Sequence, residues 1–220
     1  MMMFRQCLSN LFSRDRPTET LEELNSHELM MPFTSPGCNK CGCCVKACKT
    51  GAIEITDKWR IDIGKCLFCD DCVDACEKGE LIRVEAPLYS LTRNGLIFEE
   101  GIPPTAASGT VSKEMIATFG SSVAIRELDA GSCNACEIEV NSAGNPYYDM
   151  SRFGIKITAS PRHADVILVT GPMTRNMHTA SLMTYDAAPF PKMVVAFGTC
   201  AISGGIFVGG DVVGEGVKDT

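Results

Sequence analysis

Eight cysteines in the first part of this sequence form two similar runs. In each run, three cysteines follow one another at intervals of three residues, and a fourth comes four residues later. The two runs contain Cys38, Cys41, Cys44 and Cys48, then Cys66, Cys69, Cys72 and Cys76. Thiolates are soft ligands that suit zinc and iron–sulfur clusters, so this spacing indicates metal binding.

The two runs are expected to exchange their fourth ligands. A tight loop can supply three thiolates to a cubane cluster, and with this spacing the fourth cysteine of each run binds the other cluster. We therefore predict two 4Fe–4S clusters. The first cysteine group is Cys38, Cys41, Cys44 and Cys76, and the second is Cys66, Cys69, Cys72 and Cys48. A pair of zinc sites or a disulfide knot is the alternative, but zinc tolerates many spacings and the repeat favours clusters.

This segment resembles a bacterial two-cluster ferredoxin module, and its paired runs form an internal repeat. The sequence departs from the family at Lys49 and Glu77, which stand where a proline usually follows the fourth cysteine. The resemblance implies a ferredoxin-like α+β module over residues 32–84. Cys43, which lies beside Cys44, is expected to be a spare thiol that binds no iron.

Composition narrows the possible classes of protein. The chain has 220 residues, 45% of them hydrophobic, which suits one large domain or two small ones. Its net charge of −7 argues against a nucleic-acid partner, which would need a basic surface. We find no signal peptide and no apolar run long enough to span a membrane. The 13 cysteines are therefore expected to serve metal binding in a reducing compartment.

The remaining sequence suggests how the domains are divided. Residues 1–31 are interpreted as a leader in which proline and charge oppose a long packed helix. Residues 85–111 are interpreted as a linker, because glycine and proline punctuate its second half. A short helix is expected over residues 112–119. Residues 112–220 then form the second domain.

Alternating strand and helix patterns in the second domain predict an α/β fold with an open parallel sheet. Continuous apolar runs such as residues 166–169 and 194–197 are typical of strands buried on both faces. A helix is expected over residues 174–187, with Thr174 as its cap and prolines beyond its end. The expected strands cover residues 123–128, 154–158, 165–170 and 193–197.

Three more cysteines follow strands of this sheet. Cys133 and Cys136 come after the first strand, and Cys200 comes after the last. The carboxyl ends of parallel strands meet at one edge, where ligands bind in open α/β sheets. A redox-active dithiol is the alternative for the Cys133–Cys136 pair, although it would need no third cysteine at another strand end.

This region is similar to the small iron–sulfur subunit shared by respiratory complex I and the membrane-bound nickel–iron hydrogenases. The similarity lies in residues 133–139, 152–155, 160–165, 170–172 and 198–200. Asn134 and Ala135 separate the first two cysteines, as in the hydrogenase branch that includes formate hydrogenlyase and energy-converting hydrogenases, whereas complex I has them adjacent. The resemblance implies a flavodoxin-like domain with one 4Fe–4S cluster. Its ligands would be Cys133, Cys136, Cys200 and a fourth cysteine in a Pro-Gly-Cys-Pro segment.

The sequence departs from this family after Cys200, because no further cysteine follows it. We therefore expect a C-terminal segment beyond residue 220 to supply the fourth ligand of the third cluster. The family's glutamate after the cysteine pair maps to Glu139. Arg162 and His163 either tune the third cluster from a neighbouring loop or only pack and cap before a strand.

The resemblance implies an electron-relay subunit without a catalytic centre of its own. Electrons would pass from a ferredoxin or formate dehydrogenase-type donor through the three clusters to a nickel–iron site on a hydrogenase large subunit. The chain would lie in the cytoplasm on the inner face of the membrane, held there by membrane subunits of the same complex. Two alternatives remain open: a complex I-like subunit that passes electrons to quinone, and a freestanding polyferredoxin carrier.

Overall fold

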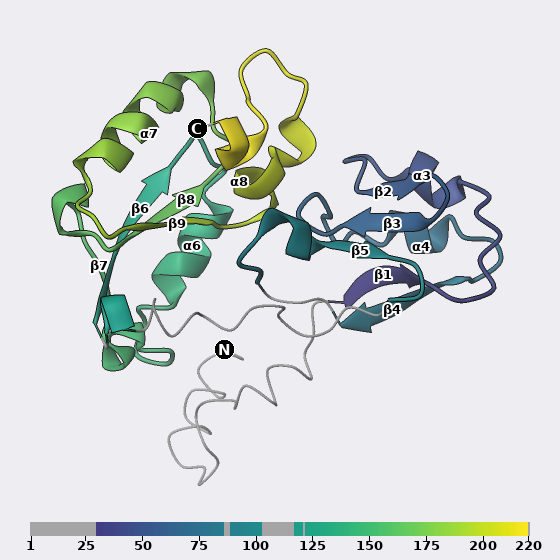
Figure 1. Cartoon of the computed structure of the whole chain (residues 1–220), viewed down its shortest axis with the longest axis horizontal. Helices are drawn as coiled ribbons and strands as arrows, with labels where there is room; N and C mark the ends of the chain where they lie inside the picture. The colour runs from purple at the N-terminus through teal and green to yellow at the C-terminus, as the bar shows by residue number, and fades with distance from the viewer. Residues whose placement is uncertain (1–29, 86–88, 103–116, 121, 220) are drawn as a thin grey trace, which may run out of the picture.

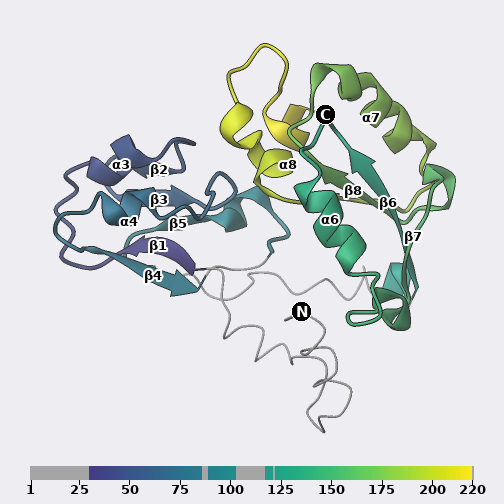
Figure 2. The same ribbon diagram turned by 180° about the vertical axis from the view of Figure 1, so that it is seen from behind.

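The computed structural model describes residues 30–85, 89–102, 117–120 and 122–219. Figures 1 and 2 show two modules side by side. The N-terminal module covers the described residues from 30 to 102, and the C-terminal module covers residues 122–219. The leader up to residue 29, Cys7 and the stretch from 103 to 116 lie outside the described residues.

Short strands and two short helices build the N-terminal module around one core. In chain order these elements are β1 (Met30–Thr34), α3 (Cys43–Ala47), β2 (Ile53–Ile55), β3 (Trp59–Asp62), α4 (Asp71–Asp74), β4 (Leu81–Glu85) and β5 (Ile97–Glu99). β1 pairs with β4, and β2, β3 and β5 form a second sheet in that order, with all pairs antiparallel. Trp59, Met31 and Ile61 are fully buried in the core.

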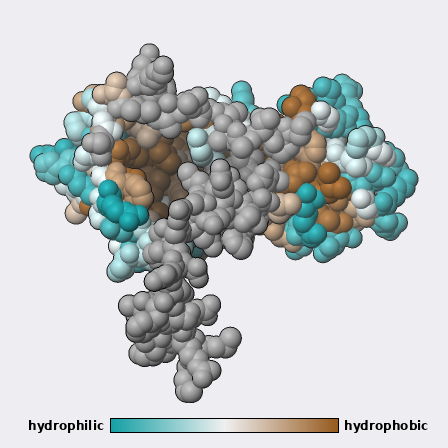
Figure 3. Space-filling view, turned by 90° about the horizontal axis from the view of Figure 1, so that it is seen from below, coloured by the Kyte–Doolittle hydropathy of each residue, from teal (hydrophilic) through white to brown (hydrophobic). Residues whose placement is uncertain are grey.

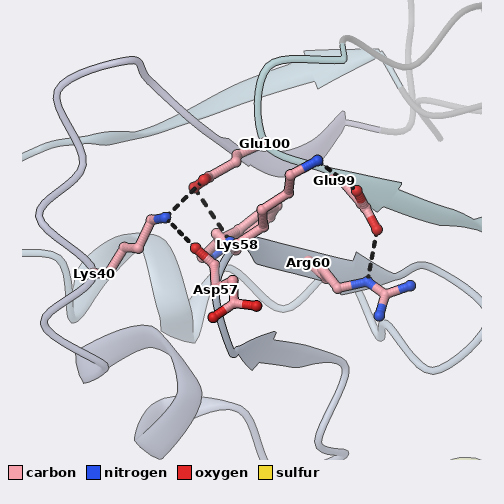
Figure 4. A network of polar contacts seen from close by, with 7 residues as sticks. Lys40, Asp57, Lys58, Arg60, Glu99 and Glu100 are labelled. Carbon is pink, nitrogen blue, oxygen red and sulfur yellow. Dashed lines mark hydrogen bonds and ion pairs between the residues drawn. The ribbon is translucent and has the colours of Figure 1, made fainter.

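Part of the expected linker belongs to this module. Ile97 and Glu99 pair with Asp62 and Arg60, so β5 is the third strand of the sheet. Figure 4 shows Glu99 forming ion pairs with both Lys58 and Arg60 of the neighbouring strand region. A strand of three residues is too short to show a periodic pattern, so the sequence pattern did not reveal it.

The C-terminal module contains the predicted parallel sheet. Its main elements are β6 (Val123–Asp129), α6 (Ala135–Ser142), β7 (Ile155–Ile157), β8 (Val166–Thr170), α7 (Arg175–Ala187), β9 (Met193–Ala196) and α8 (Thr199–Ser203). The strands lie in the order β7-β6-β8-β9, and every pair is parallel. The α/β prediction is therefore confirmed, and each strand lies within one residue of its expected ends.

Helices on either side of the sheet bury its central strand. α6 and α7 lie on opposite sides of the sheet in both ribbon views (Figures 1 and 2). All five residues of β8 are consequently buried, as the continuous apolar run predicted. Because the strands are parallel, the segments after β6 and β9 emerge at the same edge.

Both modules also carry apolar side chains at their surfaces. Ile82 and Leu91 are exposed on the N-terminal module, and Tyr148 and Phe153 are exposed on the C-terminal module. Seen from below, each module shows an apolar area that hydrophilic side chains border (Figure 3). Apolar areas of this kind commonly mark protein interfaces.

Candidate metal centres

The first cysteine group surrounds a single cavity in the N-terminal module. The cavity has a volume of about 320 Å³, and Cys38, Cys41, Cys44 and Cys76 all lie on its walls. Cys44 is held by α3, whereas Cys76 follows α4. The fold thus brings the fourth cysteine of the second run beside the first three cysteines of the first run.

The spacing of these thiols fits a cluster better than a single ion. Within the described ranges, no three Cys, His, Asp or Glu side chains are close enough to hold one metal ion. Zinc would draw its thiolates to about 2.3 Å from one point. The thiolates of a cubane instead bind separate irons, so they stand apart around a larger body. Four thiols spread over the walls of a cavity are compatible with that larger body.

The loops of the two runs have the same backbone shape. Lys40 and Phe68 each lie two residues after the first cysteine of their run, and both have φ of 55°. Gly42 and Asp70 each follow the next cysteine and are also left-handed, with φ of 79° and 64°. This region costs energy for residues with side chains, so its recurrence at matching positions points to a functional constraint on both loops.

Cys43, which is expected to be a spare thiol, lies at this cavity. It lines the cavity, and its sulfur is 3.2 Å from the sulfur of Cys41. Hydrogen bonding by the Cys43 amide and thiol lowers the pKa of Cys41. Cys43 can therefore contact a bound cluster's ligand even if it binds no iron itself.

Two cysteines of the second group, Cys66 and Cys72, are buried, whereas Cys69 is exposed and Cys48 is half-buried. Burial, together with repulsion from the nearby Cys48 and Cys69, raises the pKa of Cys66 to about 11. Burial likewise raises the pKa of Cys72 to about 12, with added repulsion from Cys66 and Cys48. Cys48 from the first run thus lies among the cysteines of the second. These thiols stay protonated at neutral pH until a cation binds, so metal binding would release protons.

The third cysteine group lies at the carboxyl edge of the parallel sheet. Cys133 and Cys136 follow β6 at the start of α6, and Cys200 lies in α8 after β9. Burial and then Glu137 raise the pKa of Cys136, and Cys200 and Cys133 are close enough to raise it further. Gly198 makes this approach possible, because a Cβ there would lie 2.7 Å from the Cys136 sulfur.

A buried carboxylate beside this group was not predicted. Glu137 is only 7% exposed, and neither of its carboxylate oxygens has a hydrogen-bond partner among the described residues. Glu139, the residue expected from the sequence, is exposed on α6 instead. The helix turns Glu137 and Val140 inward, since residues three apart share a face. Helical periodicity counted back by three residues from the apolar Val140 could have identified Glu137.

The structure does not bring Arg162 and His163 to the third cysteine group. Both are exposed in a 3-10 turn, η3 (Pro161–His163), which comes before β8. They therefore lie at the amino edge of the sheet, whereas the cysteines lie at the carboxyl edge. A strand rises about 3.3 Å per residue, so β8 separates the two edges by roughly 15 Å. This placement favours the packing role for Arg162 and His163 over the tuning role.

A direct contact joins the second and third cysteine groups. The hydroxyl of Thr199, next to Cys200, donates a hydrogen bond of 3.1 Å to the carbonyl oxygen of Cys66. The same interface is tight at Gly64, where a Cβ would lie 2.7 Å from a methyl carbon of Ile202. The two modules thus meet where their cysteines lie.

Comparisons with known proteins relate the C-terminal module to a group of redox subunits. Residues 133–219 match the family model described as NADH ubiquinone oxidoreductase, 20 Kd subunit. Formate hydrogenlyase subunit 7 of Escherichia coli strain K12 is 47% identical over 83 residues, which cover 38% of this chain and 32% of that protein. The expected resemblance to this group of subunits is confirmed for this part of the chain.

Two further relatives come from both branches of the group. The probable membrane-bound hydrogenase subunit mbhJ of Pyrococcus furiosus is 44% identical over 89 residues, covering 40% of this chain and 53% of that protein. An NADH-quinone oxidoreductase subunit of Carboxydothermus hydrogenoformans is 51% identical over 74 residues, covering 33% of this chain and 45% of that protein. The chain thus spans about a third to a half of the length of these relatives. In the part of the chain that the structure describes, no helix is long and apolar enough to cross a membrane.

Proposed function

We propose that this chain, a relative of redox subunits from hydrogenases and NADH-quinone oxidoreductases, relays electrons through three 4Fe–4S clusters. When bound, such a cluster accepts and gives up single electrons at a potential set by its surroundings. The first and second cysteine groups would each hold one cluster in a ferredoxin-like module. The third group would hold another at the edge of a flavodoxin-like sheet, whose strand order matches that fold.

The contact between Thr199 and Cys66 is the observation that carries this proposal. Cys66 belongs to the second cysteine group, and Thr199 adjoins Cys200 of the third. The bond therefore joins the two groups across one interface. Electron transfer weakens steeply with distance, so adjacent sites are what a relay needs. The α3 and α4 helices likewise pack against each other and hold the first and second groups together. These contacts support the order first, second, third.

The exposure of particular cysteines suggests where electrons enter and leave. Cys41 is exposed at the first group and Cys69 at the second, which favours entry at the N-terminal module from a ferredoxin or formate dehydrogenase-type donor. Cys133 is exposed at the third group, and Ile138, Ile206 and Phe207 near that group expose large apolar side chains. Such side chains favour a partner subunit at this end, because exposed apolar surface commonly marks protein interfaces.

We infer that this partner is a nickel–iron hydrogenase large subunit, which would carry the catalysis. The separated pair Cys133 and Cys136 favours the hydrogenase branch over a quinone-linked one. Membrane subunits of the same complex would hold the chain at the inner face of the membrane.

Anaerobic reconstitution followed by electron-flow measurements tests the proposal. The eight cysteines of the first two groups should hold about eight irons stably, and a filled third group should raise the total to about twelve. Cys200→Ala should then lose about a third of the iron. In the complex, Cys133→Ala should stop electron flow to hydrogen while dithionite still reduces the first two clusters. A chain that stably binds two zinc ions instead would overturn the proposal.

Activity and size measurements on the same complex distinguish the proposed relay from a quinone-linked subunit and from a freestanding carrier. Reduction of quinone without hydrogen turnover would favour the complex I-like interpretation. A native chain that migrates alone in gel filtration would favour a freestanding carrier. Co-migration with a hydrogenase large subunit supports the proposed relay.

A further inference from the structure

Trp59 has a polar group that the fold leaves without a partner. It is the only tryptophan of the chain, and its side chain is completely buried. Its ring packs edge-on against Phe33, with ring centroids 5.7 Å apart and planes at 82°. The indole nitrogen, Nε1, has no hydrogen-bond acceptor among the described residues. A buried N–H without an acceptor costs free energy, so it calls for an explanation.

The indole lies against a cysteine of the first group. Trp59 and Cys44 belong to the same buried core cluster, and the indole N–H lies near enough to the Cys44 thiol to oppose the rise in its pKa that burial causes. Cys44 is itself only 5% exposed and lines the cavity of the first group. A neutral thiol is a weak acceptor, whereas a thiolate bound to iron is a stronger one. The orphaned N–H therefore has a natural acceptor once Cys44 becomes a cluster ligand.

The backbone around Trp59 fixes the indole in this place. Trp59 pairs with Ile55 across β2 and β3, and Ile55 also lines the cavity. The Trp59 amide donates to one carboxylate oxygen of Glu100 at 3.2 Å. The other oxygen of Glu100 accepts from Lys40 at 2.7 Å, as Figure 4 shows. Since Lys40 lies in the loop of the first group, Glu100 ties that loop to the strand that carries the indole.

We propose that the Trp59 indole N–H donates a hydrogen bond to the Cys44 sulfur when that sulfur holds the first cluster, and so raises the potential of that cluster. The inference rests on the proposed function, because it needs a cluster in the first group. Added negative charge on a reduced cluster is shared with its ligand sulfurs. A donor aimed at one of them stabilises the reduced form, and hydrogen bonds to the sulfurs help to set cluster potentials. Trp59 thus acts on the cluster through the Cys44 sulfur and does not bind iron itself.

The second group has no comparable indole donor, since Trp59 is the one tryptophan of the chain. Backbone amides contact its sulfurs, with Ala52 donating to Cys48 at 3.2 Å and Phe68 donating to Cys66 at 3.4 Å. The Thr50 hydroxyl also lies 3.6 Å from the Cys48 sulfur, and either atom can donate. Substitution of Trp59 should therefore change the first cluster and leave the second unchanged.

Potentiometric titration of the reconstituted full chain, followed by EPR, tests this asymmetry. Trp59→Phe should shift the first cluster to a more negative potential without shifting the second. The first cluster's signal is identified by its loss in Cys38→Ser. Phe33→Leu is the matched control, because it disturbs the same packing but keeps the indole N–H, and it should leave the potential closer to that of the natural chain. Equal potentials in the natural chain and Trp59→Phe would overturn the inference.

Spectroscopy of the natural chain tests the hydrogen bond even if Trp59→Phe fails to fold. Because there is one tryptophan, ultraviolet resonance Raman spectra report on this indole alone. Its N–H band should move to the hydrogen-bonded position when clusters are built in, compared with the cluster-free chain. A band that does not move, at about eight irons per chain, overturns this inference but not the relay. A chain that takes up no iron overturns both.

Discussion

The Thr199 hydroxyl donates a hydrogen bond to the carbonyl oxygen of Cys66, although 133 residues separate them in the sequence. Thr199 precedes a cysteine of the third group, and Cys66 belongs to the second. The bond therefore fixes how the two modules approach each other at the place where their metal centres are proposed. Because the bond comes from a threonine, the proposed relay can be tested by substitutions that leave every cysteine intact.

Removing this hydroxyl should loosen the contact without removing iron. Thr199→Val keeps the shape of the side chain but leaves the Cys66 carbonyl without its donor, at a cost of about 1 kcal/mol. We expect slower reduction of the third cluster after the second is reduced, measured by rapid-freeze EPR of the complete complex. Thr199→Ser, which keeps the hydroxyl, is the control. Unchanged kinetics in Thr199→Val would argue against an electron path across this contact.

The crossed assignment of ligands predicts which cluster a single substitution damages. Cys48 lies in the first run but close to Cys66 and Cys72. Cys48→Ser should therefore impair the second cluster and spare the first, with a loss of up to about four of about eight irons. EPR and iron analysis of the reconstituted chain measure this. Cys43→Ser is the comparison, since it should retain both clusters. Loss of the first cluster in Cys48→Ser would refute the crossed ligation.

Gly198 should be essential to the third site because a side chain at this position would collide with the Cys136 sulfur, in addition to straining the backbone. Both Gly198 and Gly209 have left-handed φ, at 85° and 87°. A Cβ at Gly198 would meet the Cys136 sulfur, whereas nothing lies within 4 Å of one at Gly209. Each change to alanine costs roughly 1–3 kcal/mol through the backbone, and Gly198, whose ψ is 159°, lies in a region that is essentially restricted to glycine. Only Gly198→Ala should also weaken iron binding at the third group.

This comparison requires protein in which the third group is filled with iron. Iron content and thermal unfolding of the two variants separate the effects. Equal iron loss in both variants would assign the effect to backbone strain alone.

The cluster-free chain should lose stability at alkaline pH. Cys66 and Cys72 ionise near pH 9.0 when unfolded, but burial raises their pKa to about 11 and about 12 in the fold. Between these values the folded state binds more protons than the unfolded state, so stability falls as pH rises above about 9. Urea unfolding at several pH values from about 7.5 to about 10.5 would measure the change. At pH values below the unfolded pKa, both thiols are protonated in the folded and the unfolded state. They therefore add no pH dependence to the free energy of unfolding there.

A double variant isolates this effect from other titrating groups. Cys66→Ser with Cys72→Ser removes both thiols and should flatten the alkaline decline. A decline of the same steepness in the double variant would trace it to other residues. Bound clusters should also suppress the decline, because their thiolates carry no proton to lose.

Local patterns allowed much of the fold and site to be predicted. The buried run that became β8 and the helix after Thr174 are encoded by residues close together in sequence. The two cysteine loops are equally local, since ligands three residues apart must share one turn. The short β5 was missed because its pairing with β3 across the sheet, rather than its own three residues, stabilises it.

The surroundings of the third site also depend on more than local patterns. Glu139 was expected from its place in a motif, but the register of α6 decides that Glu137 is the buried carboxylate. Arg162 and His163 belong to a motif of the resembled family and were expected either to tune the third cluster or only to pack and cap before a strand. β8 runs parallel to β6, and this places the two residues at the amino edge of the sheet. The direction of a strand relative to its neighbours is a property of the assembled sheet.

The cysteine spacing, the repeat and the α/β pattern of the second module can be recognised in the sequence alone, because each depends on contacts within a few residues. Which distant groups meet depends on the complete fold. It brought Thr199 to Cys66 and the Trp59 indole to Cys44, through packing between elements that no local pattern relates. Side-chain neighbours across an interface depend on how whole surfaces fit together, so they emerge only when the complete chain is folded.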